Sequence, residues 1–552
     1  MLQDLADLPT GSRIEADVCI VGAGAAGISL ARTLLNTSLN VCLLESGGFD
    51  HEAAVTDLGS GENRGQTYYD LVDARLRFFG GTTNIWGGRC APLDADDFRK
   101  KSWVPHSGWP IDEQDLQEGY RFAHQQLEIG DPIDAATAWN RLRARQPDFL
   151  GDAFSSSFWY FDQQAERFNA NRCEDLFKST NVRVLTHASV SHLSARPNAT
   201  GLKDIEVRDL HGNSARVSAR AFVLAAGAIE NARLLLASRD VESQGIGNGH
   251  DQVGRYFMEH PHGRLGRVDS DQAFTLWSAF EKRFPNGSAP LMPVLRGSAE
   301  LQEREGILNT ALTFKLQRDP GAGLALNKRA YMTLKHQLSP NRTNRTLWHG
   351  YNRARRMFQR HRTPLVRMAS RTSGRHVYAM IRAEQAPNPD SRVLLSDTCD
   401  ALGSPRADLN WQTSSQDKHT LNVLAQELDK ALQRAGAGRF EPEAWVCDES
   451  NAWPLDPTVG NHPIGGYHHM GTTRMAENNR SGVVDKNCQV FGYSNLFITG
   501  SSVFSTAGWA NPTLTIIALA HRLANHLTES LRKQAKPPLA QKGAPEARHL
   551  AS

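Results

Sequence analysis

The sequence predicts an α/β protein with one mainly parallel sheet assembled from distant segments and a second, mainly antiparallel sheet between them. A short apolar run, a glycine-rich turn and a helix-like stretch follow one another at 16–37. Two later apolar runs, at 221–227 and 496–500, also end in glycine and lead into helix-like stretches. The intervening VLLSD and DLNWQ favour antiparallel strands.

Length and composition limit the class of protein. At 552 residues the chain is too long for one simple core. No apolar run approaches the roughly 18–20 residues that a membrane span needs. The N-terminus lacks an apolar signal region, and the seven cysteines are scattered without a CxxC pair. We therefore expect a reduced, cytoplasmic protein without a disulfide framework or a zinc site.

The strand–turn–helix signals recur along the chain, which predicts two interleaved domains. The first domain is Rossmann-type and discontinuous, and the second is α+β and carries the antiparallel sheet. The Pro-, Ala- and Lys-rich C-terminus predicts a disordered tail. The expected bounds are 14–100, 180–262 and 463–533 for the first domain, 101–179 and 263–462 for the second, and 534–552 for the tail.

The N-terminal unit carries a dinucleotide-binding pattern. In GAGAAG, Gly22 permits the tight turn, Gly24 lets the backbone approach a pyrophosphate, and Gly27 lets helix pack on strand. The helix N-terminus then faces the phosphates. Glu45 ends the next strand, 18 residues past Gly27, where an acid binds the adenosine ribose. This pattern does not separate NAD from FAD.

A second glycine cluster, FFGGTTNIWGGRC at 78–90, has two interpretations. Its backbone N–H groups and hydroxyls can bind a phosphate or pass close to a flat ring. The alternative is a plain glycine-rich turn.

Four motifs, in order along nearly the whole chain, resemble the glucose–methanol–choline (GMC) oxidoreductase family. They are VCIVGAGAAG…LLESG, FFGGTTNIWGG, FVLAAGAIENARLLLAS and the C-terminal YHHMGTTRM…GSSVFSTAGWANPTLTIIALA. GTTRM and ANPTLT most resemble the pyranose-oxidase and sugar-dehydrogenase members. The resemblance implies FAD, a substrate domain whose sheet covers the flavin, and hydride transfer from an alcohol carbon to flavin N5.

The resemblance also assigns residues to the cofactor. Val190 matches a position whose backbone meets adenine, and Pro512 and Thr513 match positions near the pyrimidine side of the flavin. The complete set is Gly22, Ala23, Gly24, Ala25, Gly27, Glu45, Ser46, Gly80, Gly81, Thr82, Thr83, Asn84, Ile85, Trp86, Gly87, Val190, Ala226, Gly227, Gly500, Ser501, Pro512 and Thr513. In pyranose oxidases a histidine before the Trp of the glycine loop can bind flavin covalently. Ile85 stands there, so we expect non-covalent FAD.

The motif pattern assigns catalysis to His468 as the base and Asn511 as its partner. An imidazole titrates near working pH, and a carboxamide can hold the alcohol oxygen. A lone histidine in a glycine-rich loop is more often structural; the pairing with Asn511 favours catalysis. If the segment is extended, His468 and His469 point to opposite faces. We therefore expect His469 at the pocket edge and no metal site. Trp509 forms a pocket wall or only packs.

Residues 320–383 contain twelve Arg, two Lys and no acidic residue. Within them, 347–371 predicts a basic amphipathic helix. Three interpretations stay open: contact with an anionic membrane surface, contact with an acidic substrate or protein electron acceptor, or a solvated helix. Without a nucleic-acid-reading module, nucleic acid is not an expected partner.

The predicted function is FAD-dependent oxidation of an alcohol on a sugar, glycoside or related polyol. The electron acceptor (oxygen, a quinone or a redox protein) is not identified by any motif. The alternatives are oxidation of a simple or lipophilic alcohol by a membrane-associated dehydrogenase, a flavin-binding protein without turnover, and an NAD-dependent dehydrogenase.

Overall fold

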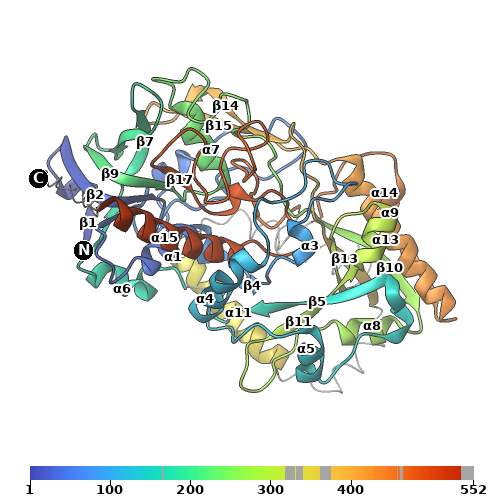
Figure 1. The fold of residues 1–552 in the computed structure, drawn as a ribbon. Helices are drawn as coiled ribbons and strands as arrows, with labels where there is room; N and C mark the ends of the chain where they lie inside the picture. Colours follow the sequence, from blue (N-terminus) through green and yellow to red (C-terminus); the bar gives the residue numbers. More distant parts are fainter. Residues whose placement is uncertain are drawn as a thin grey trace, which may run out of the picture.

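The computed structural model describes residues 1–164, 167–317, 330, 340–360, 375–456, 458–459 and 464–535. Two large sheets, one on each side of Figure 1, organise the chain. The predicted α/β fold, with one mainly parallel and one mainly antiparallel sheet, is confirmed. The predicted tail at 534–552 lies almost entirely outside the described residues.

The first sheet has the order β1-β6-β3-β2-β9-β8-β7, with β17 also paired to β9. Its apolar runs are buried on both faces, as expected for parallel strands between helices. The parallel strands are β1 (Leu2–Asp4), β2 (Ser12–Val21), β3 (Val41–Leu44), β6 (Val182–Thr186), β9 (Ser214–Leu224) and β17 (Leu496–Ile498). The antiparallel edge consists of β7 (Ser189–Ala195) and β8 (Leu202–Arg208).

All three strand–glycine–helix units predicted from the sequence contribute to this sheet. The helices that follow the glycines are α1 (Ala25–Thr33), α7 (Ala228–Ala237) and α15 (Thr513–Ala535). Helix α15 runs across the parallel sheet in Figure 1, and its buried face packs against α1. The C-terminal segment thereby brings 500–513 to the same edge of the sheet as the N-terminal glycine turn.

The second sheet has the order β16-β10-β13-β12-β11-β5-β4, and every pair is antiparallel. Its strands are β4 (Arg89–Cys90), β5 (Phe154–Phe161), β10 (His262–Ser270), β11 (Leu291–Gly297), β12 (Ala311–Gln317), β13 (His376–Arg382) and β16 (Gly438–Pro442). The predicted strands VLLSD and DLNWQ fall in β14 (Arg392–Cys399) and β15 (Pro405–Asn410), which form a separate two-stranded antiparallel sheet. That small sheet packs on α7 of the first domain.

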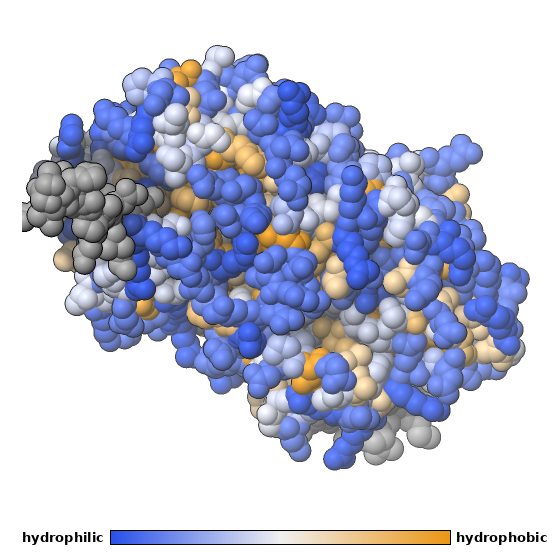
Figure 2. Space-filling view, viewed as in Figure 1, coloured by the Kyte–Doolittle hydropathy of each residue, from blue (hydrophilic) through white to orange (hydrophobic). Residues whose placement is uncertain are grey.

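The structure describes ten further α-helices. They are α2 (Ala53–Asp57), α3 (Ala95–Phe98), α4 (Gln117–Gln126), α5 (Ala135–Leu142), α6 (Glu174–Lys178), α8 (Ala273–Ala279), α9 (Ala299–Glu305), α11 (Arg342–Arg360), α13 (Ser415–Arg434) and α14 (Ala444–Cys447). The face shown in Figure 2 is largely hydrophilic, with small separate apolar areas.

Several elements depart from the predicted domain bounds. Strand β1 precedes residue 14 but belongs to the parallel sheet. Strand β4 lies within 14–100 but pairs with β5 of the antiparallel sheet. Helix α4 lies within 101–179 but packs on α15: the Tyr120 hydroxyl is 3.0 Å from Thr515 Oγ1, and a Cβ on Gly119 would meet the backbone of Ala518. A helix inserted in the chain can dock on either domain, and no local pattern in α4 specifies which.

Candidate active site

A single elongated cavity collects most of the predicted site residues. It runs from the carboxyl ends of β2 and β3 to the segment around His468. The predicted residues that line it are Gly22, Ala23, Gly24, Ala25, Glu45, Ser46, Gly80, Gly81, Thr82, Thr83, Ile85, Trp86, Gly87, Val190, Ala226, Gly227, His468, His469, Gly500, Ser501, Asn511, Pro512 and Thr513. Gly27, Asn84 and Trp509 are absent from this lining.

The first glycine turn has the geometry that the dinucleotide pattern requires. Gly22 has φ +104°, and a Cβ there would lie 2.8 Å from the Ala225 carbonyl oxygen. A Cβ on Gly27 would lie 1.9 Å from the Gly22 carbonyl oxygen, so Gly27 acts in packing rather than in lining. A Cβ on Gly24 would meet nothing within 4 Å, and α1 begins at the next residue, Ala25. This cradle suits a diphosphate.

Glu45 closes one side of this turn. Its carboxylate accepts hydrogen bonds from the Ala23 N–H at 3.0 Å and the Gly47 N–H at 3.1 Å. Burial raises the pKa of Glu45, and these two N–H groups oppose the rise by stabilising the carboxylate. A carboxylate held in this way has further lone pairs for the hydroxyls of a ribose.

Hydrogen bonds from the Asn84 side chain stabilise the second glycine loop. Its amide donates to the Phe79 carbonyl at 3.1 Å and the Gly81 carbonyl at 2.9 Å, so Asn84 supports the loop from behind. The Trp86 Nε1 faces no hydrogen-bond acceptor in the described part of the chain although it is buried. A buried donor beside a cavity indicates a ligand that supplies the acceptor. FAD has such acceptors, and the two glycine loops fit its phosphates.

At the other end of the cavity, three imidazole and amide groups form a hydrogen-bonded row. Asn511 Nδ2 lies 3.1 Å from His468 Nε2, and His468 Nδ1 lies 2.8 Å from His260 Nδ1. His260 Nε2 lies 2.8 Å from the Gly508 carbonyl oxygen. The structure therefore brings the predicted pair His468 and Asn511 into direct contact.

Glu259 fixes the backbone around this row. Its carboxylate accepts from the backbone N–H groups of His260 at 2.8 Å, His468 at 2.9 Å and Gly466 at 3.1 Å. The Tyr68 hydroxyl donates to it at 2.5 Å. Burial raises the pKa of Glu259, whereas these donors favour the carboxylate. One buried side chain thus ties both histidine segments together.

His468 and His469, the expected base and the expected pocket-edge residue, both line the cavity. Tyr467, just before the pair, adopts φ +59°. His469 is buried beside the rings of Phe257 and Tyr68, with centroids 5.6 and 6.1 Å away. Its Nε2 meets no partner among the described protein groups, a second buried polar atom that points to a ligand.

The buried His469 predicts sensitivity to acid. Burial, and next the positive charge of Arg75, lowers the pKa of His469 to about 3, whereas an unperturbed histidine titrates near about 6.5. The unfolded chain therefore binds more protons between these values, and the free energy of unfolding falls as pH drops from about 6.5 toward 3. His469→Gln should flatten this fall by up to about 1.4 kcal/mol per pH unit. Denaturant unfolding at several pH values measures the slope.

Exposed His250→Gln is the matched control for this measurement, because it removes a histidine without opening the cavity. The control should keep the wild-type slope. A wild-type slope in His469→Gln as well would contradict the prediction.

Trp509 packs behind the cavity and does not form its wall. Its Nε1 donates to Asp94 at 2.9 Å, its ring centroid lies 5.9 Å from that of Trp159, and the Arg296 guanidinium lies 5.6 Å from the ring centroid. Of the two interpretations given for Trp509, a pocket wall or a packing residue, its place in the structure fits packing.

Several charged residues near the cavity were not predicted. Arg75 and Arg77 line it and form ion pairs with Glu230, at 3.4 and 3.2 Å. Burial favours protonated Glu230, but Arg233, Arg77 and Arg75 together lower its pKa to about 2. Arg382 reaches the cavity from β13 of the other sheet. The motifs gave no signal for these residues, because each acts through contacts made across the fold.

None of the helices that the structure describes is long and apolar enough to cross a membrane. The described residues also contain no group of three or more His, Cys, Asp or Glu side chains arranged to hold a metal ion.

Comparisons with known proteins show what the chain is similar to. Residues 17–291 match the family model of FAD dependent oxidoreductases, and residues 387–520 match that of GMC oxidoreductases. The chain is 27% identical to the large subunit of fructose dehydrogenase from Gluconobacter japonicus over 60% of this chain and 51% of that one. It is 24% identical to 2-methyl-1,2-propanediol dehydrogenase from Mycolicibacterium austroafricanum over 94% of this chain and 96% of that one. The structure of pyridoxine 4-oxidase, at 16% identity and TM-score 0.52, has the same fold over 92% of this chain and 98% of that one.

Proposed function

The chain belongs to the GMC oxidoreductase family and depends on FAD, and from that premise we propose that it oxidises an alcohol group on a sugar, glycoside or related polyol. The observation that carries the proposal is the contact between His468 Nε2 and Asn511 Nδ2 at the end of the cavity. The names of the relatives, a fructose dehydrogenase and a diol dehydrogenase, support a polyhydroxylated substrate.

The chain's own residues divide the work at the substrate carbon. His468 Nε2 accepts the proton of the alcohol hydroxyl once the alcohol displaces the Asn511 amide from it, because the other ring nitrogen is engaged by His260. The Asn511 amide donates to the alcohol oxygen and orients the reacting C–H bond. FAD, when bound, supplies the acceptor for the hydride that leaves this carbon. The products are the carbonyl compound, a protonated His468 and the reduced cofactor.

The residues proposed to hold FAD lie along the cavity. The turn from Gly22 to Gly27 and the start of α1 would bind the diphosphate, and Glu45 the ribose. The loop from Gly80 to Gly87 would lie beside the diphosphate and the flavin ring. His469 and Trp86 have the buried polar atoms that a bound ring system could satisfy.

Anaerobic bleaching of the flavin absorbance tests the function. The purified protein is mixed with sugars, glycosides, diols and lipophilic alcohols, and air is then admitted. We expect bleaching by at least one polyhydroxylated compound and the slowest bleaching by lipophilic alcohols. Fast recolouring in air would identify an oxidase, and slow recolouring a dehydrogenase. Bleaching by lipophilic alcohols alone would replace the proposed substrate class, and a flavin that nothing bleaches would contradict turnover.

We predict that the FAD is bound non-covalently. Ile85 has no nucleophilic atom, and it lines the cavity immediately before Trp86. Acid precipitation should therefore release all of the flavin into the supernatant, measured by its absorbance. Flavin that stays with the protein pellet would contradict the prediction, and peptide mapping of the coloured fragment would then locate the bond.

We propose that α11 contacts an anionic membrane surface, which a cytoplasmic protein meets at the inner leaflet. Arg345 anchors the helix: it pairs with Asp50 at 2.8 Å, and its guanidinium lies 4.6 Å from the Phe78 ring centroid. Leu347 and Tyr351, four residues apart and hence on one face, are 67% and 49% exposed. The predicted helix is 347–371; α11 includes the described residues from Arg342 to Arg360, and 361–371 lies outside the described residues.

Vesicle flotation tests this contact. The full chain should float with vesicles containing phosphatidylglycerol, less so with neutral vesicles or in high salt, because the segment carries exposed arginines. The double variant Leu347→Glu, Tyr351→Glu should lose most of the bound fraction. Val241→Glu, which alters an apolar residue 38% exposed elsewhere, is the matched control. Failure of the wild type to float with anionic vesicles at low salt would contradict the contact.

A further inference from the structure

The row of hydrogen-bonded groups at the cavity end begins and ends on one loop. Asn511 and Gly508 belong to the segment that precedes α15, while His468 and His260 come from two other segments. The contacts run from Asn511 Nδ2 to His468 Nε2, from His468 Nδ1 to His260 Nδ1, and from His260 Nε2 to the Gly508 carbonyl oxygen. One end of the row is a carbonyl oxygen, which only accepts hydrogen bonds, and the other is an amide nitrogen, which only donates them.

The carbonyl end determines where the hydrogens lie. The Gly508 oxygen can only accept, so His260 Nε2 must carry a hydrogen. A neutral imidazole carries one ring hydrogen, so His260 Nδ1 is an acceptor. The nitrogen that faces it, His468 Nδ1, must then be the donor. This leaves His468 Nε2 without a hydrogen.

The amide end leads to the same assignment. The Asn511 atom that faces His468 Nε2 is its amide nitrogen, which can only donate. His468 Nε2 must therefore accept, as the carbonyl end also requires. A single direction of donation, from Asn511 through both histidines to Gly508, satisfies every contact in the row.

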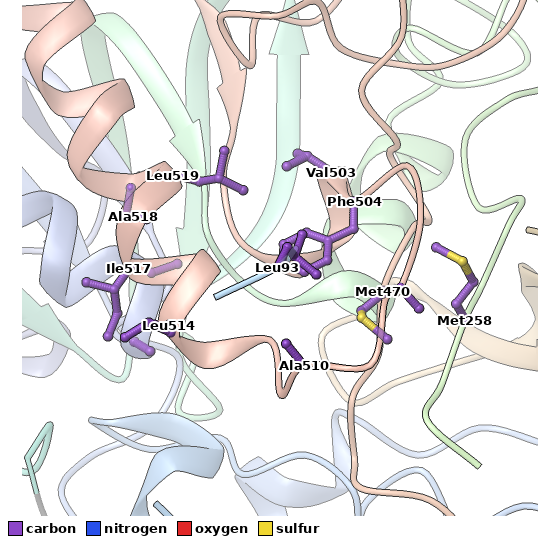
Figure 3. Packing of buried hydrophobic residues seen from close by; sticks show 14 of the residues in the cluster. Leu93, Met258, Met470, Val503, Phe504, Ala510, Leu514, Ile517, Ala518 and Leu519 are labelled. Carbon is purple, nitrogen blue, oxygen red and sulfur yellow. The ribbon is translucent and has the colours of Figure 1, made fainter. Parts of the chain in front are cut away.

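His260 is held in place to perform this task. Met258 and Met470 exchange backbone hydrogen bonds of 3.0 Å as an antiparallel bridge, which places His260 opposite His468. Figure 3 shows the two methionines close together beside the loop that carries Ala510. Glu259 accepts from the backbone N–H groups of both histidines.

The surroundings of His260 keep its ring neutral. Its side chain is buried, and burial lowers its pKa to about 4 against the opposing effect of the Gly508 carbonyl. The positive charge of Arg382 lowers the pKa further, while the Glu259 carboxylate lies next to it in the chain. A neutral His260 can accept a hydrogen bond from His468 throughout the working pH range.

We propose that His260 is a positioning residue that fixes His468 in the tautomer with hydrogen on Nδ1. His468 Nε2 then carries no hydrogen and can act as the base. The proposal rests on the proposed function for its kinetic consequences. When Nε2 takes the alcohol proton, His468 becomes an imidazolium whose Nδ1–H still donates to His260. The proton stays on His468, because the only hydrogen of His260 already lies toward Gly508.

Two substitutions separate this role from simple packing. His260→Leu removes both the acceptor and the donor, whereas His260→Gln offers an amide with one of each. We expect the leucine variant to lower the rate constant of anaerobic flavin bleaching about tenfold or more, with little change in KM and a shifted pH profile. The glutamine variant should recover most of the rate. FAD content and thermal midpoint, measured for both, control for structural loss. Equal rates in the wild type and the leucine variant would overturn the proposal.

Nitrogen NMR of the holoenzyme with 15N-labelled histidine rings gives a readout independent of turnover. The His468 signals are assigned by their loss in His468→Ala, since the chain contains 20 histidines. We expect a protonated Nδ1 and a bare Nε2 in the wild type and in His260→Gln. A wild-type His468 protonated on Nε2 would overturn the proposal. If no alcohol bleaches the flavin but the expected tautomer is found, the proposed function fails and the assignment of His260 stands.

Discussion

His468→Ala should lower the rate of anaerobic flavin bleaching by about 10²–10⁴-fold, the range that a positioned general base contributes. The FAD should remain bound, because His468 lines only one end of a cavity whose glycine turns lie at the other. Stopped-flow absorbance with the best substrate from the alcohol panel measures the rate. The flavin spectrum before mixing measures cofactor content.

The neighbouring histidine supplies the control for this result. His469→Gln keeps His468, Asn511 and His260 in their row, so it should change the substrate concentration for half-maximal rate more than the rate itself. Added imidazole should restore part of the activity of His468→Ala, because the deleted ring leaves room for a small base. Bleaching by His468→Ala at the wild-type rate would remove His468 from the mechanism.

The sequence predicts the parallel sheet and the cofactor end of the cavity well, because their signals are local. Gly27 is required by a backbone contact within one strand–turn–helix unit, and Gly22 by its own φ of +104°. Glu45 ends the next strand of the same unit, so its distance from the turn follows from chain geometry. Constraints between residues that are close in the chain give motifs with a fixed spacing, and such motifs can be recognised in the sequence.

The catalytic end is only partly predictable. His468 and Asn511 follow from a family motif, but His260 lies 208 residues before His468 and reaches it through the Met258–Met470 bridge. No spacing along the chain reports a contact of that kind. The two imidazoles face each other through their Nδ1 atoms, and this contact alone does not say which of them donates. The direction follows only when the hydrogens of all three contacts in the row are assigned together.

Single conformational details also override the sequence pattern. The alternation rule for His468 and His469 assumes an extended chain, yet residues at both positions line the cavity. Trp509 stands next to the catalytic loop, yet its ring is drawn away by Asp94 and Arg296. Placement within a few residues of a motif therefore predicts proximity to the cavity but not orientation toward it.

Gly27→Val should give a protein with little bound FAD and a lowered thermal midpoint. An added Cβ would stand 1.9 Å from the Gly22 carbonyl oxygen, far inside ordinary van der Waals contact. Helix α1 must then move away from β2, although its residues from Ala25 to Ala31 are buried. Overpacking of this kind costs about 1–3 kcal/mol or more, and it displaces the N–H groups proposed to bind the diphosphate.

Gly24→Ala separates loss of the fold from loss of the cofactor. Gly24 has an ordinary φ of −89°, and a Cβ there meets nothing within 4 Å, so the protein should fold with a wild-type thermal midpoint when flavin-free. Because Gly24 lines the cavity, the new methyl group should still weaken FAD binding, measured by flavin release on dilution. Gly249→Ala, also open but on an exposed loop, should change neither quantity. A Gly27→Val protein with wild-type FAD content and midpoint would show that helix and strand do not need this close approach.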